Sequence, residues 1–209
     1  KRCPFDQPDD ASTKAVALKF LAEGCPKPDF TENFIGNVNM GEAEVTIAPC
    51  IKSDTLMGAL RNLFASIKSG DYFALDAFLP FDGEGRREAL EVIRHGVADK
   101  LGVVSCLEIG PRYLHSTGQL QKGGPNMGVF LILSADELKD IPLPEEAAAP
   151  SLGELAKAQA AGDLATLAKR GRRCVHLHLP DNSGVTLRQL AQVVDDVIAD
   201  ILTDRALAE

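Results

Sequence analysis

A lysine interrupts the apolar side of the first predicted helix, which covers residues 10–23. Desolvation disfavours the charged form of an amine, so a buried and unpaired Lys14 would have a lowered pKa. Such an amine could exchange protons near neutral pH or donate a hydrogen bond to a sugar oxygen. The alternative is a lysine whose stem packs while its ammonium reaches water. The helical face that carries it would consist of Ala11, Lys14, Ala15, Leu18, Leu21 and Ala22.

A histidine lies in a Gly- and Pro-rich stretch, residues 110–125, which follows a buried strand predicted over residues 103–109. A histidine titrates near pH 7, so His115 could move a proton between O5 and O1 of a pyranose and help to open the ring. The alternative is a loop histidine hydrogen-bonded to the backbone. Glu108, at the end of the strand, could mimic a general base.

Polar residues near these two candidates could bind a phosphorylated ligand. Backbone N–H groups over residues 116–118 could form a small anion-binding nest, with positive charge from Arg112 and Lys122. Gln7, in the turn before the first helix, could hydrogen-bond a ligand hydroxyl or could cap the helix ahead of Pro8. An ordinary polar loop is the alternative for residues 112–122. The expected substrate-binding residues are Gln7, Arg112, Ser116, Thr117 and Gln119.

The remaining histidines and the cysteines do not indicate a metal site. His176 and His178 alternate on one face of a strand predicted over residues 173–179, but no third ligand is visible. The five cysteines are widely spaced, odd in number and without a CxxC pair, which favours neither a zinc site nor a disulfide framework. We therefore expect structural histidines, no metal and no cofactor.

Two motifs resemble the phosphoglucose isomerase family. Residues 3–14, CPFDQPDDASTK, resemble the C-terminal signature of that family, which reads Phe-Asp-Gln, a turn, variable positions and Lys. Residues 110–125, GPRYLHSTGQLQKGGP, resemble a segment of the isomerase half of bifunctional transaldolase/phosphoglucose isomerase fusions. Together the motifs imply that nearly the whole chain is the C-terminal part of such a protein. The sequence departs from the family after the turn, with Asp9-Asp10-Ala11 in place of Gly-Val-Glu, and the His-containing motif follows Phe-Asp-Gln instead of preceding it.

The resemblance implies an aldose–ketose isomerase that interconverts glucose 6-phosphate and fructose 6-phosphate. It gives Lys14 a role in ring opening, extends that role to His115, and places Gln7 near a sugar phosphate substrate. The proton-shuttling Glu and the main phosphate loop of the family lie upstream of Phe-Asp-Gln, so the upstream part of the same protein would be a partner of this chain. We expect the chain to be a fragment, inactive or very weak alone, whose parent could carry a transaldolase barrel.

Two other functions follow from the same residues. The missing carboxylate favours a sugar-phosphate-binding module without turnover. A scaffold domain, docked on a neighbour through its long C-terminal helix, needs none of the candidate site residues.

Strand-like and helix-like segments alternate along the chain. Five of them read as strands and are separated mostly by helices, which predicts a three-layer αβα sandwich with a mostly parallel sheet of about five strands. Ligands of such sheets usually bind at the carboxyl ends of the strands. The expected strands are residues 44–50, 72–79, 103–109, 128–134 and 173–179. The expected helices are residues 10–23, 54–69, 85–101 and 186–207, and a pair over 151–161 and 163–169 divided at Gly162. Residues 25–42 are expected to be irregular and 140–150 to be a linker, so that an N-terminal helix and arm (1–42) precede the αβα domain (43–209).

Composition limits the partners. Of the 209 residues, 45% are hydrophobic, enough for a real core, and aromatics make up only 5%. The net charge of −8 argues against nucleic acid, whose phosphates need a basic surface, but leaves room for a locally positive pocket. The sequence shows no apolar run long enough for a membrane span. We expect a cytoplasmic protein in a reducing compartment, and a homo-oligomer is compatible with these observations.

Overall fold

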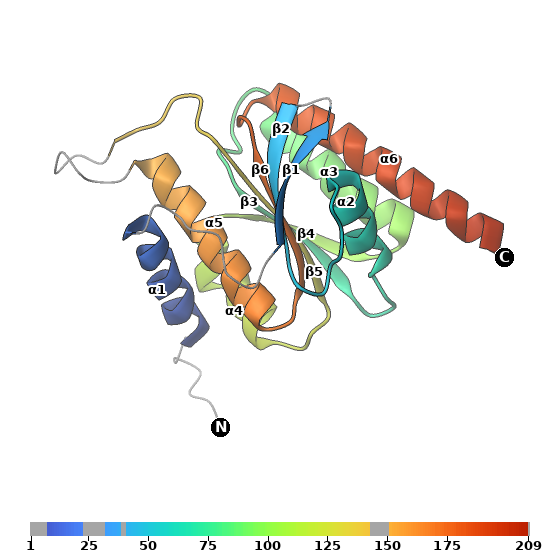
Figure 1. The fold of residues 1–209 in the computed structure, drawn as a ribbon, viewed down its shortest axis with the longest axis horizontal. Helices are drawn as coiled ribbons and strands as arrows, with labels where there is room; N and C mark the ends of the chain where they lie inside the picture. The colour runs from blue at the N-terminus through green and yellow to red at the C-terminus, as the bar shows by residue number, and fades with distance from the viewer. Residues whose placement is uncertain (1–7, 23–31, 39–40, 143–150, 209) are drawn as a thin grey trace.

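The computed structural model describes residues 8–22, 32–38, 41–142 and 151–208. Helices and strands alternate along most of this length (Figure 1). In chain order the elements are α1 (Pro8–Ala22), β1 (Glu32–Val38), β2 (Gly41–Ile47), α2 (Leu56–Ala65), β3 (Tyr72–Phe78), α3 (Arg86–Leu101), β4 (Val104–Ile109), the 3-10 helix η1 (Arg112–His115), α4 (Thr117–Gly123), β5 (Gly128–Ala135), α5 (Leu152–Lys169), β6 (Arg173–Leu179) and α6 (Gly184–Ala208).

The described strands form one six-stranded sheet in the order β1-β2-β6-β5-β3-β4. The four strands β6, β5, β3 and β4 are parallel to one another, whereas β2 is antiparallel to β6 and β1 is antiparallel to β2. The α/β class and the mostly parallel sheet are confirmed, with six strands instead of about five. The loops that follow β3, β4, β5 and β6 therefore leave the sheet at one common edge, which we call the carboxyl edge.

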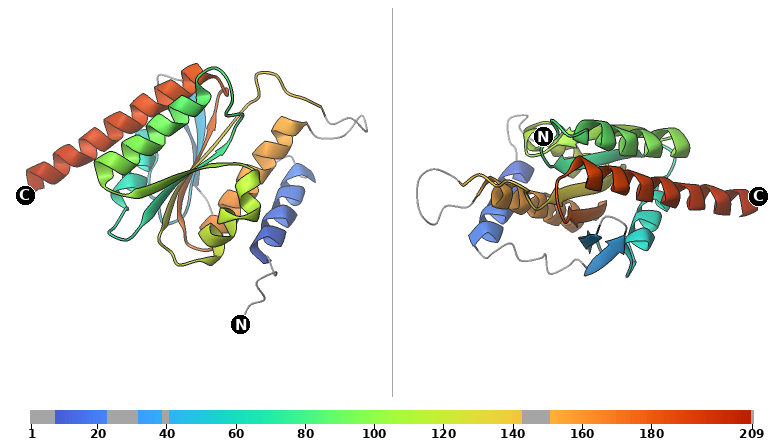
Figure 2. Two further views of the ribbon diagram at one scale, coloured as in Figure 1. Left: turned by 180° about the vertical axis from the view of Figure 1, so that it is seen from behind. Right: turned by 90° about the horizontal axis from the view of Figure 1, so that it is seen from above.

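Helices cover both faces of the sheet (Figure 2). Helices α2, α3 and α6 pack on one face, and α4 and α5 pack on the other. Helix α1 lies outside the second layer, against α5 and α4 (Figures 1 and 2). The three-layer arrangement thus carries one additional helix beyond α5.

The central strands are apolar along nearly their whole length because both of their faces are covered. β5 is buried at every position, and β3 and β6 are buried at every position but the first. Odd-numbered residues such as Leu131 and Val175 join the core under α2, α3 and α6, while even-numbered ones such as Phe130 and Cys174 join the core under α5. The edge strand β4 is only partly buried, and its Val104 is exposed.

The expectation of irregular structure over residues 25–42 is wrong where the structure describes this range. Residues 32–38 form β1, and its register with β2 pairs Val38 with Gly41, so that a two-residue connection joins the strands. Gly36 is needed at the packing contact, since a Cβ there would lie 2.6 Å from Cβ of Leu56. The proposed domain division between residues 42 and 43 passes through β2.

The expected helical pair over 151–161 and 163–169 is also wrong, because α5 is continuous across Gly162. The Thr166 hydroxyl donates to the Gly162 carbonyl over 2.9 Å, and Gly162 is buried. Burial of this stretch stabilises the helix against the unfavourable propensity of a single glycine. Helix α5 begins at a capping box in which Ser151 and Glu154 each accept a hydrogen bond from the backbone N–H of the other.

Of the expected linker over residues 140–150, the structure describes 140–142. These residues are tied to the start of α5: Asp140 accepts hydrogen bonds from the N–H groups of Ile141 and Gly153, and Pro142 pairs with Ser151 in a β-bridge. The polypeptide leaving β5 therefore lies close to the first turn of α5.

Candidate functional site

The segment between β4 and β5, expected to be an open Gly- and Pro-rich loop, contains the 3-10 helix η1 and the short helix α4. It leaves β4 at the carboxyl edge, where ligands of parallel α/β sheets usually bind. We call residues 110–125 the motif segment. It presents Arg112 and His115 as exposed side chains on η1.

Arg112 packs on the loop that follows β3. Its guanidinium carbon lies 5.0 Å from the ring centroid of Phe81, a cation–π contact. The contact joins the loops after β3 and β4 at the carboxyl edge and leaves the residue exposed. The Arg112 side chain is therefore accessible from solvent at this edge.

The other expected ligand residues of the motif segment lie around the start of α4. Ser116 and Thr117 are exposed, and the Ser116 hydroxyl donates to the Tyr113 carbonyl over 3.3 Å. Gln119 is half-buried, and its side-chain amide donates to the Leu114 carbonyl over 3.3 Å. These contacts hold the two polar side chains against η1.

A buried polar group fixes the motif segment to α5. The Tyr113 hydroxyl donates to Oδ2 of Asp163 over 2.5 Å, and the Lys122 ammonium lies 2.5 Å from Oδ1 of the same carboxylate. Burial and the neighbouring carboxylates raise the pKa of Tyr113 well above its ordinary value, so the phenol stays neutral and can donate. One aspartate on α5 thereby anchors both ends of η1–α4.

One expectation for this segment is corrected here. Lys122, expected to add charge to a ligand site, is fully buried and paired with Asp163. Gly118 is buried as well, and a Cβ there would lie 3.0 Å from the Tyr113 carbonyl oxygen and 3.3 Å from Nζ of Lys122. The expected nest over residues 116–118 stays a prediction, with Gly118 packed against Tyr113 and Lys122.

A second buried pair links α4 to the middle of the sheet. The side-chain amide of Gln121 donates to Oδ1 of Asp76 over 3.2 Å. Burial, followed by the nearby Asp163, raises the pKa of Asp76 well above its ordinary value. The guanidinium of Arg172 donates hydrogen bonds to the carbonyls of Lys122 and Gly124, at the C-terminal end of α4. The motif segment is therefore held from several directions by buried groups.

Helix α1 contacts the motif segment through α4. The helix includes Lys14 and contacts α5 along its length and α4 as well. Gln7 and the side chain of Lys14 lie outside the described residues. What the structure shows is a contact between the helix that carries Lys14 and the helix that begins two residues after His115.

The expected apolar stripe of α1 is not the buried one. Ala15 and Ala22 are exposed and Leu18 is 67% exposed, whereas Ala17 and Phe20 are buried. Phe20 packs with Ala158 and Ala165 of α5. The correction follows from the position of α5, which the sequence of α1 alone does not contain.

His176 and His178 lie in β6 beside a serine of the neighbouring strand. Both are buried, and the hydroxyl of Ser134 on β5 hydrogen-bonds to Nε2 of His176 at 2.7 Å and to Nδ1 of His178 at 2.9 Å. Nε2 of His178 lies 3.0 Å from both Lys157 and Asp136, and burial, then Lys157, lowers the pKa of His178. Within the described ranges no three His, Cys, Asp or Glu side chains come together as a metal-binding group.

Sequence reasoning missed Asp76, Tyr113 and Asp163. Asp76 lies in the apolar strand sequence YFALDAF, and Asp163 lies in an Ala- and Leu-rich helix. A charged residue inside an apolar element is the signal that could have revealed them, since carboxylates are rarely buried without partners. Their partners could not have been named, because these lie on other elements.

Comparison with known proteins gives a fold and no family. No known family's model matches the chain, and no curated protein matches it. The crystal structure of a hypothetical protein from Thermus thermophilus is similar, with a TM-score of 0.55 and 19% sequence identity over 74% of this chain. The chain spans 45% of the length of that protein. At this identity the similarity establishes the α/β fold alone.

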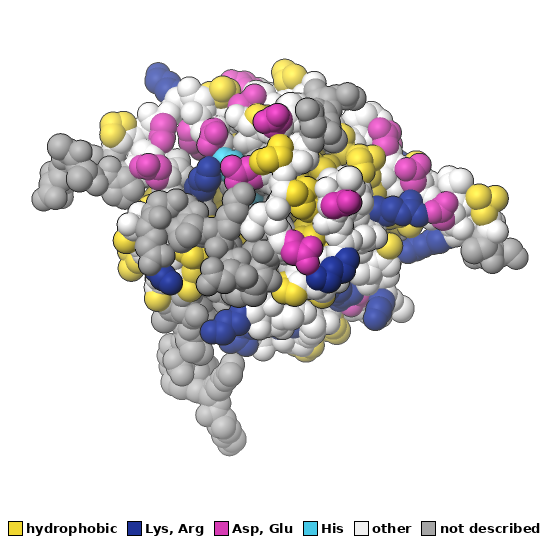
Figure 3. All heavy atoms as spheres, viewed as in Figure 1, with side chains coloured by type: hydrophobic (Ala, Val, Ile, Leu, Met, Phe, Trp, Pro, Cys, Tyr) yellow, Lys and Arg dark blue, Asp and Glu magenta, His cyan; other side chains and the backbone are white. Residues whose placement is uncertain are grey.

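One face of the molecule is mixed in charge. On the face shown in Figure 3, basic side chains lie scattered among acidic and apolar ones. None of the helices in the described part of the chain combines the length and the apolar character that a membrane crossing requires.

Proposed function

We propose that this chain is the C-terminal component of an aldose–ketose isomerase that interconverts glucose 6-phosphate and fructose 6-phosphate. The observation that carries the proposal is the packing of α1, which includes Lys14, against α4, which begins two residues after His115. The two motifs that resemble phosphoglucose isomerases are far apart in the sequence, yet they belong to contacting helices. A shared substrate explains why both motifs occur in one chain.

The residues divide the first chemical step between them. Ring opening requires a proton to leave the O1 hydroxyl and another to reach O5, a transfer suited to an amine and an imidazole. We assign these roles to Lys14 and His115, with Gln7 and Gln119 as hydrogen-bonding partners of the sugar. Arg112, with Ser116 and Thr117, binds the phosphate, since a guanidinium matches phosphate oxygens in charge and geometry.

The buried groups below the motif segment have a positioning role in this proposal. Tyr113 lies two residues before His115, and its hydroxyl is fixed to the buried Asp163. A proton-transfer group must lie within hydrogen-bond reach of the atom it serves, and small displacements are costly. The anchoring of η1 to α5 therefore holds the exposed imidazole of His115 in position.

The second step, proton transfer between C2 and C1 through a cis-enediol, needs a carboxylate base. The resemblance assigns it to the region upstream of Phe-Asp-Gln, which makes the upstream part of the same protein a partner of this chain. A transaldolase domain in that region would give the parent a second activity. The proposal needs neither metal nor cofactor. A cytoplasmic location fits the free thiols of Cys50, Cys106 and Cys174, the cysteines that the structure describes.

The test is a coupled assay on the protein that carries this chain, with fructose 6-phosphate as substrate and glucose-6-phosphate dehydrogenase as reporter. Isomerase turnover supports the proposal. Calorimetric titration with 6-phosphogluconate separates the remaining functions: binding without turnover indicates a sugar-phosphate-binding module, and no binding indicates a scaffold.

A further inference from the structure

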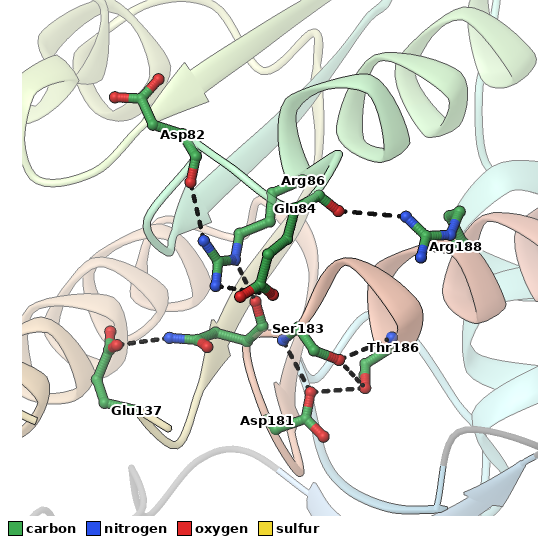
Figure 4. Close-up of polar contacts among 9 residues, drawn as sticks. Asp82, Glu84, Arg86, Glu137, Asp181, Ser183, Thr186 and Arg188 are labelled. Atoms are coloured by element: carbon green, nitrogen blue, oxygen red, sulfur yellow. Dashed lines mark hydrogen bonds and ion pairs between the residues drawn. The ribbon is translucent and has the colours of Figure 1, made fainter. Parts of the chain in front are cut away.

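Two carboxylates at the carboxyl edge show how this protein compensates a negative charge (Figure 4). The carboxylate of Glu84 lies 3.1 Å from Nη2 of Arg86. Asp181 accepts hydrogen bonds from the N–H of Ser183 over 2.8 Å and from the hydroxyl of Thr186 over 2.7 Å. A carboxylate that is removed from water needs a cation or several donors of this kind to remain charged. An aspartate buried under α4 has neither.

The charges buried between β3, α4 and α5 do not balance if both aspartates are ionised. Asp76, Lys122 and Asp163 are each 0% exposed. The Lys122 ammonium lies 2.5 Å from Asp163, which also accepts a hydrogen bond from the Tyr113 hydroxyl. Two carboxylates against one ammonium would leave one negative charge in excess, away from solvent, which is costly. The group is neutral if one carboxyl keeps a proton, and Asp76 is the one without the cation.

The surrounding titratable groups add negative charge or none. Burial raises the pKa of each phenol and each thiol near Asp76, so these groups are neutral at pH 7. The guanidinium of Arg172 is directed to the carbonyls at the end of α4. Among the described residues, the other titratable neighbours of Asp76 are one carboxylate, two phenols and two thiols: Glu108, Tyr72, Tyr113, Cys106 and Cys174.

Asp76 and Gln121 each have one oxygen without a partner. Nε2 of Gln121 donates to Oδ1 of Asp76 over 3.2 Å. Oδ2 of Asp76 and Oε1 of Gln121 are buried and have no hydrogen-bond partner in the described part of the chain. Two acceptors cannot bond to each other, and a buried acceptor without a donor costs free energy. A proton on Oδ2 turns this oxygen into a donor to Oε1, so one proton supplies both missing contacts.

We propose that Asp76 is a neutral carboxylic acid joined to Gln121 by a ring of two hydrogen bonds, and that this ring fastens α4 to β3 less firmly as the pH rises. The amide donates to Oδ1, and the acid hydroxyl donates from Oδ2 to Oε1. When α4 separates from β3, water reaches Asp76 and the carboxyl releases its proton to solvent. Separation is therefore favoured by every rise in pH over the range in which the closed form keeps the proton.

The ring makes the position of the motif segment sensitive to pH. Helix α4 begins two residues after His115 and contacts α1, so its attachment to β3 affects both. The inference does not rest on the isomerase proposal, because no sugar or phosphate takes part in the ring. Failure of one proposal leaves the other unaffected.

The protonation of Asp76 can be measured directly. The 209-residue chain is prepared with ¹³C in the aspartate carboxyl groups, and the Cγ chemical shifts are followed by NMR between pH 5 and pH 8. The Asp76 resonance is identified by its absence from the spectrum of Asp76→Asn. We expect it at the position of a carboxylic acid at pH 7, whereas Asp71, whose pKa is lowered by the hydrogen bond from Arg173, should give a carboxylate resonance. An Asp76 carboxylate at pH 7 overturns the proposal and indicates that water or a cation supplies the missing contacts.

Hydrogen exchange measures the attachment of α4. The amide of Gly124 donates to the Leu120 carbonyl over 2.8 Å and reports the opening of α4, and the amide of Leu131 in β5 reports global unfolding. Each rate is divided by the rate of an unstructured peptide at the same pH to give a protection factor. We expect Gly124 to be less protected than Leu131 and to lose about tenfold in protection per pH unit, since opening releases one proton. Equal protection of the two amides means that α4 opens only with the whole protein, which refutes a pH-dependent attachment.

Three variants separate the ring from its surroundings. In Asp76→Asn an amide takes the place of the acid hydroxyl and has no proton to lose, so the protection of Gly124 should not vary with pH. Asp76→Leu has a similar size but forms no hydrogen bonds, and it should protect Gly124 at least about tenfold less than Asp76→Asn does. Glu108→Gln is the control, because it removes the neighbouring carboxylate and leaves the ring intact, so the pH dependence should persist.

Two results would refute the ring. One is a pH dependence of Gly124 that remains in Asp76→Asn, and the other is equal protection of Gly124 in Asp76→Leu and Asp76→Asn. Thermal melting verifies that each variant is folded. If Asp76→Leu does not fold, the carboxyl resonance and Asp76→Asn decide the matter.

Discussion

Lys122 and Asp163 form an ion pair in which neither side chain is exposed to solvent, with Nζ 2.5 Å from Oδ1. The pair joins α4 to α5, and Tyr113 adds a hydrogen bond to the same carboxylate. Buried ion pairs contribute little net stability compared with apolar replacements, but the loss of one partner leaves a charge with no compensation. Because of this asymmetry, a substitution at only one of the two residues should destabilise the packing of the motif segment on α5.

Replacement of the lysine alone should therefore destabilise the protein strongly. We expect Lys122→Met to lower the free energy of unfolding by about 3–5 kcal/mol, because Asp163 remains buried without its cationic partner. The double variant Lys122→Met/Asp163→Asn should recover most of that loss, since both charges are then absent. Urea denaturation measures both values.

The exposed pair of Lys52 and Glu32, with side chains 71% and 54% exposed, provides the control. Lys52→Met should change the free energy of unfolding by less than about 1 kcal/mol, as is usual for surface pairs. A double variant at 122 and 163 as unstable as Lys122→Met alone would contradict the explanation from uncompensated charge.

Asp76 should make stability depend on pH in a predictable direction. Its pKa in the folded protein is raised well above the ordinary value of 3.8, mainly by burial. From about pH 4 upward the unfolded chain releases this proton while the folded protein keeps it, so Asp76 lowers stability as the pH rises toward its folded pKa. Asp76→Asn should gain stability relative to the unchanged protein by up to about 1.4 kcal/mol per pH unit over this range. Urea denaturation at pH 5 and pH 8 tests this.

Asp71 gives the opposite sign and serves as the control. A hydrogen bond from Arg173 lowers the pKa of Asp71. Its stabilising contribution is present above its ordinary pKa of 3.8 and is lost as the pH falls toward the folded value. Asp71→Asn should therefore be less stable than the unchanged protein at neutral pH, with a difference that narrows below about pH 4. If both variants respond to pH in the same direction, the assignment for Asp76 is wrong.

Much of the fold could be predicted because the central elements show their burial in their composition. β3, β5 and β6 read as strands since both of their faces are covered, and α3 ends at Gly102 in the left-handed conformation that favours glycine. β1 was missed because an edge strand with Asn33, Gly36 and exposed positions lacks a continuous apolar run. Its partner β2 is the next strand along the chain, so the missed element is a local hairpin whose first strand lacks an apolar pattern.

The site could be predicted only in part, for a related reason. The position of the motif segment after β4 follows from strand order, and His115 and Arg112 are indeed exposed there. The burial of Lys122 depends on Asp163, which lies on a different helix far along the chain. The buried face of α1 likewise depends on α5, so that periodicity alone selected the wrong residues.

Substitution of two glycines by alanine should change the free energy of unfolding in opposite directions. A Cβ on Gly96, in the middle of α3, would meet no atom within 4 Å, so Gly96→Ala should raise the free energy of unfolding by about 0.5–1 kcal/mol through helix propensity. A Cβ on Gly110 would lie 2.5 Å from Cδ1 of Phe78, so Gly110→Ala should lower it by about 1–3 kcal/mol through overpacking. Thermal melting of both variants gives the signs directly. A stabilising Gly110→Ala would mean that the Phe78 ring has room to move.

The proposed ring-opening roles make a final prediction about turnover. In the protein that carries this chain, Lys14→Met and His115→Asn should each lower kcat/KM for fructose 6-phosphate by about a hundredfold or more, the usual contribution of a positioned proton-transfer group. Lys19→Met is the matched control: it removes the same charge from the same helix at an exposed position, and it should leave turnover unchanged.

Binding distinguishes a chemical role from a structural one. Affinity for 6-phosphogluconate, which resembles the open-chain sugar, should change little in the two variants, because ring opening is not needed to bind it. A variant that loses turnover and affinity together has lost the shape of the site, and Arg112→Met should show that second pattern because it removes a proposed phosphate ligand. Full turnover in Lys14→Met would exclude the lysine from the reaction and leave the contact between α1 and α4 as helix packing alone.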